Sequence, residues 1–117
     1  MTMIAVENVT DAGVVIELGK RLTSENTNEF MQIIRTVPVA FAPTVIVKMG
    51  ETTLVDSAGV GALVQALKHL TKVNGRFALA ELRPEIHRAF QLMNLQQVFD
   101  IYETEALARA SLTSRRT

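Results

Sequence analysis

One stretch, from Thr53 to Val73, constrains the fold more than any other part of the sequence. A short apolar run leads into the polar pair Asp56-Ser57, then into small residues, and then into apolar residues at helical spacing. This pattern predicts a helix with one buried face. Because the first N–H groups of a helix lack partners within it, Asp56 and Ser57 are favoured as capping residues. The predicted buried face holds Val60, Leu63, Val64, Leu67 and Leu70, and the opposite face holds Ala58, Ala62, Gln65, His69 and Lys72.

The rest of the chain alternates between strand patterns and helix patterns. The predicted strands cover 4–9, 14–18, 44–49, 76–82 and 98–102, with a hairpin turn at 10–13. A first helix is capped by Thr23 or Ser24 and ends at Pro38, and a third begins at Pro84. A last helix is capped by Thr104 and runs to about Leu112. The apolar stripes of the first and third helices are Phe30, Ile33, Ile34 and Val37, and Ile86, Ala89, Phe90 and Met93.

The element order is therefore β-β-α-β-α-β-α-β-α. Strands that are joined through helices run parallel, with right-handed crossovers, whereas the first hairpin adds one antiparallel strand. We expect an α/β fold with a mixed, mostly parallel sheet. A chain of 117 residues makes one domain. We take that domain to cover 1–117, with about 113–117 as a frayed tail.

Composition excludes several classes of function. Twelve basic and twelve acidic residues cancel, so a nucleic-acid or membrane partner is not expected. The absence of cysteine excludes disulfides and thiolate chemistry and fits a reducing cytosol. The N-terminal segment lacks the pattern of a signal peptide, and no apolar run is long enough to span a bilayer. We expect a cytoplasmic protein.

Enzyme chemistry is also disfavoured. His69 lies about 18 Å along the predicted helix from Ser57, too far to act as its base, and His87 is expected to face solvent. No G-x-S-x-G elbow occurs, and two histidines without paired spacing make a metal site improbable. The segment that contains Gly59 and Gly61 lacks the lysine of a phosphate loop and is too short for a dinucleotide fingerprint. We expect no enzyme, no metal and no cofactor.

What remains is a hydroxyl at the start of a helix. Ala58 and Gly59 leave the Ser57 oxygen accessible and let another backbone approach closely. The alternative is a helix cap that packs against a neighbouring loop. The polar segment from Thr23 to Asn28 is likewise either an exposed first turn or part of a surface beside Ser57. The residues alone leave both alternatives open.

The segment from Leu54 to Gly61 resembles the Asp-Ser-Ser/Thr-Gly-Leu/Val-Gly signature of anti-sigma-factor antagonists, which are STAS domains of bacterial partner switching. The resemblance extends to Gly19–Phe30, Asn74-Gly75 and Leu82–Leu95 and so covers nearly the whole chain. It implies a small α/β domain with helices mainly on one side of the sheet, no catalysis, and Ser57 as the phosphoacceptor. It also implies that the unphosphorylated protein binds an anti-sigma factor of the histidine-kinase-like ATPase fold. That partner phosphorylates the serine with ATP, and a serine phosphatase resets it.

The resemblance also indicates a partner-binding surface that combines the start of the second helix, the segment 23–28 and the helix face through Ala62 and Gln65. Its predicted residues are Thr23, Ser24, Asn26, Asp56, Ser57, Ala58, Gly59, Ala62 and Gln65. Two positions depart from the family pattern: Ala58 replaces a hydroxyl residue, and Thr23 replaces a common aspartate beside the basic pair Lys20-Arg21. The alternative is a STAS scaffold subunit of a stress-sensing or transporter-associated assembly. The intact Asp56-Ser57 pair favours the antagonist.

Overall fold

The computed structural model describes residues 4–9, 13–37 and 43–114. Residues 10–12 of the predicted hairpin turn, the predicted helix end at Pro38 and the last three residues lie outside the described part. In chain order the elements are β1 (Ile4–Val9), β2 (Gly13–Leu18), β3 (Arg21–Leu22), α1 (Thr27–Thr36), β4 (Thr44–Lys48), β5 (Leu54–Val55), α2 (Ser57–Lys72), β6 (Arg76–Ala80), α3 (Pro84–Leu92), a 3-10 turn (Leu95–Gln97), β7 (Asp100–Tyr102) and α4 (Glu105–Ser114).

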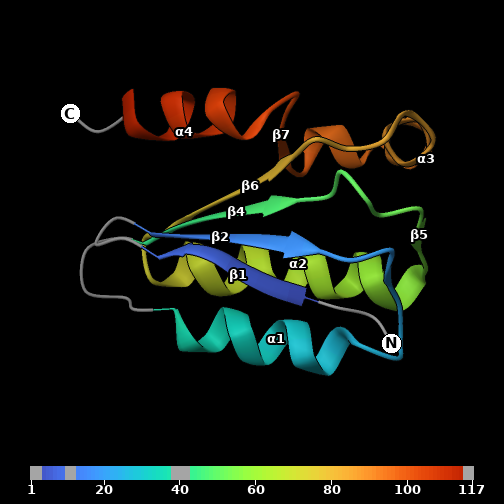
Figure 1. Cartoon of the computed structure of the whole chain (residues 1–117), viewed down its shortest axis with the longest axis horizontal. Coiled ribbons are helices and arrows are strands. Elements are labelled where there is room, and N and C mark those ends of the chain that lie inside the picture. The colour runs from blue at the N-terminus through green and yellow to red at the C-terminus, as the bar shows by residue number, and fades with distance from the viewer. Residues whose placement is uncertain (1–3, 10–12, 38–42, 115–117) are drawn as a thin grey trace.

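The main sheet confirms the predicted mixed, mostly parallel arrangement. Its strand order is β1-β2-β4-β6-β7. The β1–β2 pair is antiparallel, and the pairs β2–β4, β4–β6 and β6–β7 are parallel. The short strands β3 and β5 form a separate parallel pair, which the sequence pattern did not predict. In Figure 1 this pair lies at the end of the molecule where α2 begins.

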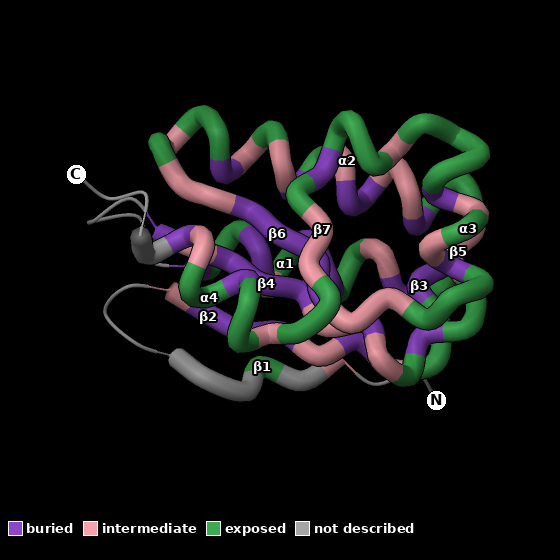
Figure 2. The backbone as a smooth tube through the Cα atoms, turned by 90° about the horizontal axis from the view of Figure 1, so that it is seen from above, coloured by how far each residue is buried: buried purple, intermediate pink, exposed green. Residues whose placement is uncertain are grey.

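Helices cover the two faces of the sheet unequally. Figure 1 shows α1 and α2 along one face and α4 along the other. Side chains of α3 join the same large apolar core as α1 and α2, so most helices serve one face, as expected. A smaller cluster beneath α4 contains Val15, Ile46, Ala78, Ala80, Ala108 and Leu112. The central strands are buried between the two layers (Figure 2).

Alternation along the strands explains this division. Val45 and Val47 of β4 face the large core, whereas Ile46 between them faces α4. In β6, Phe77 and Leu79 likewise face the large core, whereas Ala78 faces α4. Successive side chains of a strand point to opposite faces, so a nearly continuous apolar run is required where both faces are covered.

The buried face of α2 differs from the predicted one. Leu63 and Leu70 are fully buried, but Val60, Val64 and Leu67 are only partly buried. The buried set of α2 is Gly59, Ala62, Leu63, Ala66 and Leu70. Helix α2 packs against the sheet on one side and against α1 on another. The small residues of α2 that face α1 are therefore covered as well. The prediction that Ala62 lies on an exposed face is therefore wrong.

Other boundaries move by a few residues. Helix α1 begins at Thr27 with Asn26 at its N-cap position, so the prediction of Thr23 or Ser24 as its cap is wrong. Met93 follows α3 and is 51% exposed, so it does not belong to the buried stripe. Helix α4 continues to Ser114, and its predicted cap is confirmed, since Leu107 N donates to Thr104 Oγ1 at 3.1 Å.

The revised register of α2 makes a direct prediction about stability. Leu63→Ala should lower the free energy of unfolding by about 2–5 kcal/mol, because it leaves a cavity in the large core. Leu67→Ala should cost less, since Leu67 is only partly buried. Urea unfolding followed by circular dichroism measures both variants. A larger loss for Leu67→Ala than for Leu63→Ala would contradict the register.

Candidate functional site

The short strands β3 and β5 position the start of α2. Their register pairs Arg21 with Leu54 and Leu22 with Val55. The pairing continues one residue further, since the backbone N–H of Asp56 donates to the Leu22 carbonyl at 3.3 Å. The first turn of α2 is therefore held directly beside the segment that follows β3.

Asp56 joins these two segments through its carboxylate. Its Oδ1 accepts from the backbone N–H of Gly59 at 2.8 Å, which confirms Asp56 as the cap of α2. Its Oδ2 accepts from the backbone N–H of Ser24 at 3.3 Å. A single side chain thus caps the helix and ties the turn after β3 to it.

That turn is built by buried polar side chains. Asn26 Oδ1 accepts from the Thr23 N–H at 2.9 Å, and Asn26 Nδ2 donates to the Arg21 carbonyl at 3.0 Å. Thr23 Oγ1 accepts from the Glu25 N–H at 3.3 Å. Thr23 and Asn26 are 6% and 5% exposed, so their side chains shape the turn and contribute little accessible surface. Ser24 is exposed beside Asp56.

Ser57 is the first residue of α2, and its side chain is exposed. Within the described part of the chain, its hydroxyl makes no hydrogen bond. Ala58 is exposed as well, whereas Gly59 is buried. A Cβ added at Gly59 would lie 2.1 Å from the Leu22 carbonyl oxygen. Asp56 and Gly59 therefore provide the cap and the close packing, and Ser57 and Ala58 remain accessible.

A groove between α1 and α2 opens beside Ser57. It encloses about 330 Å³ and is lined by Thr27, Asn28, Met31, Arg35, Ala58, Gly61, Ala62 and Gln65. Ala62 is 4% exposed and forms part of the groove floor, whereas Gln65 is exposed, as expected. Thr27 and Asn28 belong to the segment 23–28 that was predicted as part of this surface, but Met31 and Arg35 further along α1 were not predicted. The sequence signal for them is the spacing of Thr27, Met31 and Arg35, which repeats every four residues.

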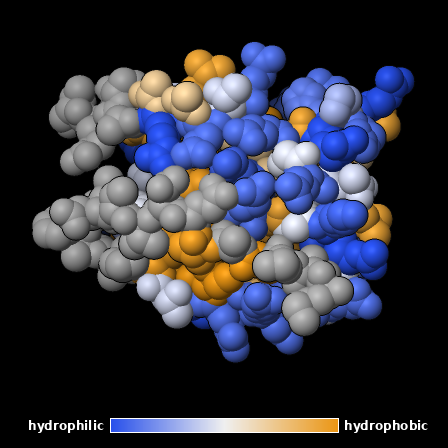
Figure 3. All heavy atoms as spheres, in the orientation of Figure 1, coloured by the Kyte–Doolittle hydropathy of each residue, from blue (hydrophilic) through white to orange (hydrophobic). Residues whose placement is uncertain are grey.

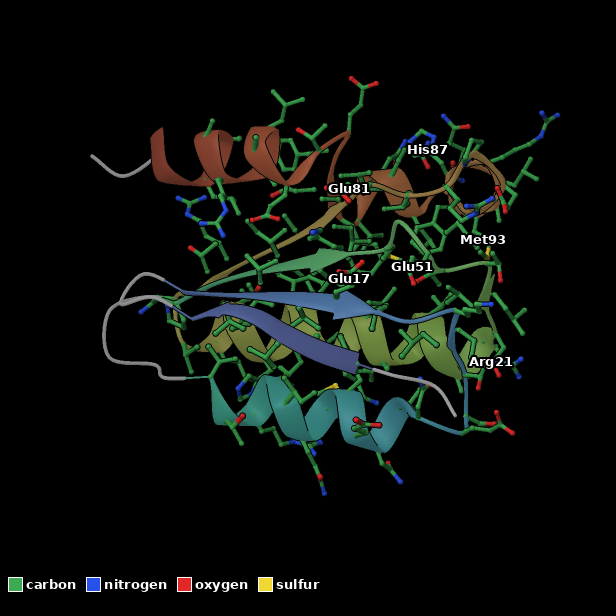
Figure 4. All side chains as sticks on the ribbon, viewed as in Figure 1. Glu17, Arg21, Glu51, Glu81, His87 and Met93 are labelled. Carbon is green, nitrogen blue, oxygen red and sulfur yellow. The ribbon has the colours of Figure 1, made fainter. Side chains whose placement is uncertain are left out.

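The histidines lie away from this site. His69 is in the last turn of α2, about 18 Å along the helix axis from Ser57. Figure 4 places His87 on α3, well separated from the start of α2. Among the described residues, no group of three His, Asp or Glu side chains is arranged to hold a metal ion. Within the described ranges, every helix is too short or too polar to span a bilayer.

Asp56 offers a test of this geometry. Asp56→Ala should lower the free energy of unfolding by about 0.5–2 kcal/mol, because it removes the helix cap. Asp56→Asn should cost less, since asparagine also caps helices well. Chemical denaturation measures both. Equal stability of Asp56→Ala and wild type would mean that the capping bond contributes nothing.

The fold and site together define a small mixed α/β domain that displays one accessible serine at the start of a helix. The family model of the STAS domain matches residues 3–108. The chain therefore belongs to the STAS domain family.

Solved structures and curated relatives agree with this assignment. The anti-sigma factor antagonist SpoIIAA in its unphosphorylated form is 25% identical with a TM-score of 0.78, and the match covers 98% of this chain and 100% of that one. The phosphorylated Bacillus SpoIIAA is 27% identical with a TM-score of 0.71, over 93% and 98% of the two chains. The anti-sigma F factor antagonist of Paenibacillus polymyxa is 24% identical over 58% of either chain. The matches span 58% to 63% of the curated relatives' length.

Proposed function

We propose that this protein is an anti-sigma-factor antagonist that is switched by phosphorylation of Ser57. The observation that carries the proposal is the accessible Ser57 hydroxyl at the start of α2, where Asp56 already provides the cap. A hydroxyl that has no structural bond within the described chain can be modified without dismantling the helix. Its neighbour Ala58 is small and exposed, which leaves room for a kinase to reach the oxygen.

The proposed partner is an anti-sigma factor of the histidine-kinase-like ATPase fold. Relatives named as anti-sigma factor antagonists support an anti-sigma factor as the partner class. In this proposal the unphosphorylated protein binds the ATPase, and the ATPase then transfers the γ-phosphoryl group of ATP to Ser57 Oγ, with ADP as the leaving group. A serine phosphatase hydrolyses the phosphoester and restores binding.

The expected surface comprises Ser24, Asp56, Ser57, Ala58 and Gln65. Phosphorylation adds about −1.5 to −2 charges at pH 7 to this surface. The start of a helix favours negative charge, whereas the neighbouring Asp56 carboxylate opposes it. The fold therefore tolerates the phosphate, but a close-fitting partner has to desolvate it, which weakens binding.

Intact-mass spectrometry tests the proposal. The protein is incubated with ATP and with a purified histidine-kinase-like ATPase encoded beside its gene. We expect a mass increase of one phosphoryl group in wild type and none in Ser57→Ala. The position is then read by peptide fragmentation. Phosphorylation at Ser24 instead of Ser57 would contradict the proposal, and so would the absence of phosphorylation at both residues. A stable large particle on size-exclusion chromatography, without phosphorylation, would favour a scaffold subunit.

A further inference from the structure

We propose that the groove between α1 and α2 is a second docking site, which accepts an acidic side chain of the ATPase that acts on Ser57. Arg35 is the residue that selects this side chain. The inference rests on the proposed function, because it extends the same interface away from the phosphoacceptor. It adds a specificity-determining residue on a helix that carries no part of the phosphoacceptor signature.

The course of the groove makes it continuous with the region around Ser57. Figure 1 shows α1 and α2 lying side by side and running in the same direction. The groove begins at Thr27 and Ala58, next to Ser57, and reaches Arg35 and Gln65. From Ala58 to Gln65 the helix rises about 10 Å. A partner segment in contact with Ser57 therefore reaches Arg35 within about two helical turns.

Gly61 supplies an argument for close approach by a partner. Glycine inside a helix is unfavourable relative to alanine, so its presence calls for a reason. Gly59 has such a reason in the Leu22 carbonyl, but a Cβ added at Gly61 would meet no heavy atom within 4 Å. The packing of the fold does not require glycine there. A partner backbone or small side chain resting on the groove would account for it.

The charges of the lining indicate what the partner presents. Arg35 is exposed and forms no ion pair within the described part of the chain. None of the other residues that line the groove is acidic. Asn28, Thr27 and Gln65 add hydrogen-bonding groups around a floor formed by Met31 and Ala62. This combination fits an Asp or Glu side chain that pairs with the Arg35 guanidinium, which binds carboxylates through two parallel bonds.

The test compares binding of three variants to the ATPase by isothermal titration calorimetry. Arg35→Glu and Gly61→Leu should each bind about 10-fold to 100-fold more weakly than wild type. Arg88→Glu is the matched control, since it makes the same charge change on α3, where Arg88 is exposed. It should bind as wild type does. Thermal melting of each variant establishes that it is folded before binding is compared.

A charge swap identifies the partner side chain. Acidic residues on the ATPase surface are changed singly to lysine, and one of these changes should restore binding to Arg35→Glu. If none of these changes to lysine restores binding to Arg35→Glu, the assignment of an acidic side chain is overturned. Wild-type affinity in folded Arg35→Glu and Gly61→Leu, with Ser57 still phosphorylated, would overturn the docking site alone. If the ATPase neither binds nor phosphorylates wild type, the proposed function fails, and this inference fails with it.

Discussion

Ser57→Ala should give a folded protein that binds its partner and is never phosphorylated. The Ser57 side chain is exposed, and the cap of α2 comes from Asp56. The free energy of unfolding should therefore stay within about 0.5 kcal/mol of wild type. Phosphoryl transfer from radiolabelled ATP and calorimetric binding measure the two properties separately. In the proposed switch this variant is a permanently active antagonist.

Ser57→Asp should also stay folded but bind at least about 10-fold more weakly, because a charge enters an interface that has to exclude water. The positive end of α2 favours the new carboxylate by about 0.3–1 kcal/mol, and repulsion from Asp56 offsets part of this. Ser57→Asn is the control, since it has the same size without the charge. Phosphorylation of Ser57→Ala by the ATPase, or wild-type affinity of Ser57→Asp, would place the switch at another residue.

The main sheet was predictable because its signals are local. The run from Thr44 to Met49 is rich in β-branched residues and nearly continuously apolar. Its central residues are buried on both faces of the sheet, where such a run is required. The end of α2 is likewise encoded by adjacent residues, in the pair Asn74-Gly75. Asn74 adopts φ 61°, and the Gly75 N–H returns to the Leu70 carbonyl at 2.7 Å. These features depend on residues close together in sequence.

The strands β3 and β5 were not predictable, since each has two residues and shows no alternation. They exist because backbone groups about thirty positions apart pair with each other, as when the Thr53 N–H donates to the Lys20 carbonyl at 2.8 Å. Buried Thr52 supports the same link, since its hydroxyl donates to the Gly19 carbonyl at 2.7 Å. A local pattern carries no information about such pairing.

The candidate site was predicted in part for the same reason. The Asp56 cap and the exposure of Ser57 follow from their place at the helix start. The burial of Thr23, Asn26 and Ala62 depends on neighbours that the sequence does not locate. In the view of Figure 3, apolar atoms gather near β1 and above α1, and the end of the molecule where α2 begins is mostly hydrophilic. From its polar composition, the segment 23–28 at that end is expected to be exposed, and its hydrogen bonds are what bury Thr23 and Asn26.

Replacing either of the two glycines near the start of α2 by alanine should change the free energy of unfolding, but in opposite directions. Gly59→Ala should lower the free energy of unfolding by about 3 kcal/mol or more, because the new Cβ overlaps packed atoms. It would lie 2.1 Å from the Leu22 carbonyl oxygen and 2.9 Å from Val55 Cγ1. The carbonyl is backbone that also accepts from the Asp56 N–H. It cannot retreat without separating β3 from the start of α2.

Gly61→Ala should instead raise the free energy of unfolding by about 0.5–1 kcal/mol, since alanine stabilises a helix interior and the added Cβ meets open space. Urea unfolding of both variants, with the slopes compared to wild type, separates the two effects. Since the same chemical change is made two residues apart in one helix, propensity alone predicts a gain for both. A gain for Gly59→Ala would show that β3 does not hold the start of α2, and the position of Ser57 would then lack its support.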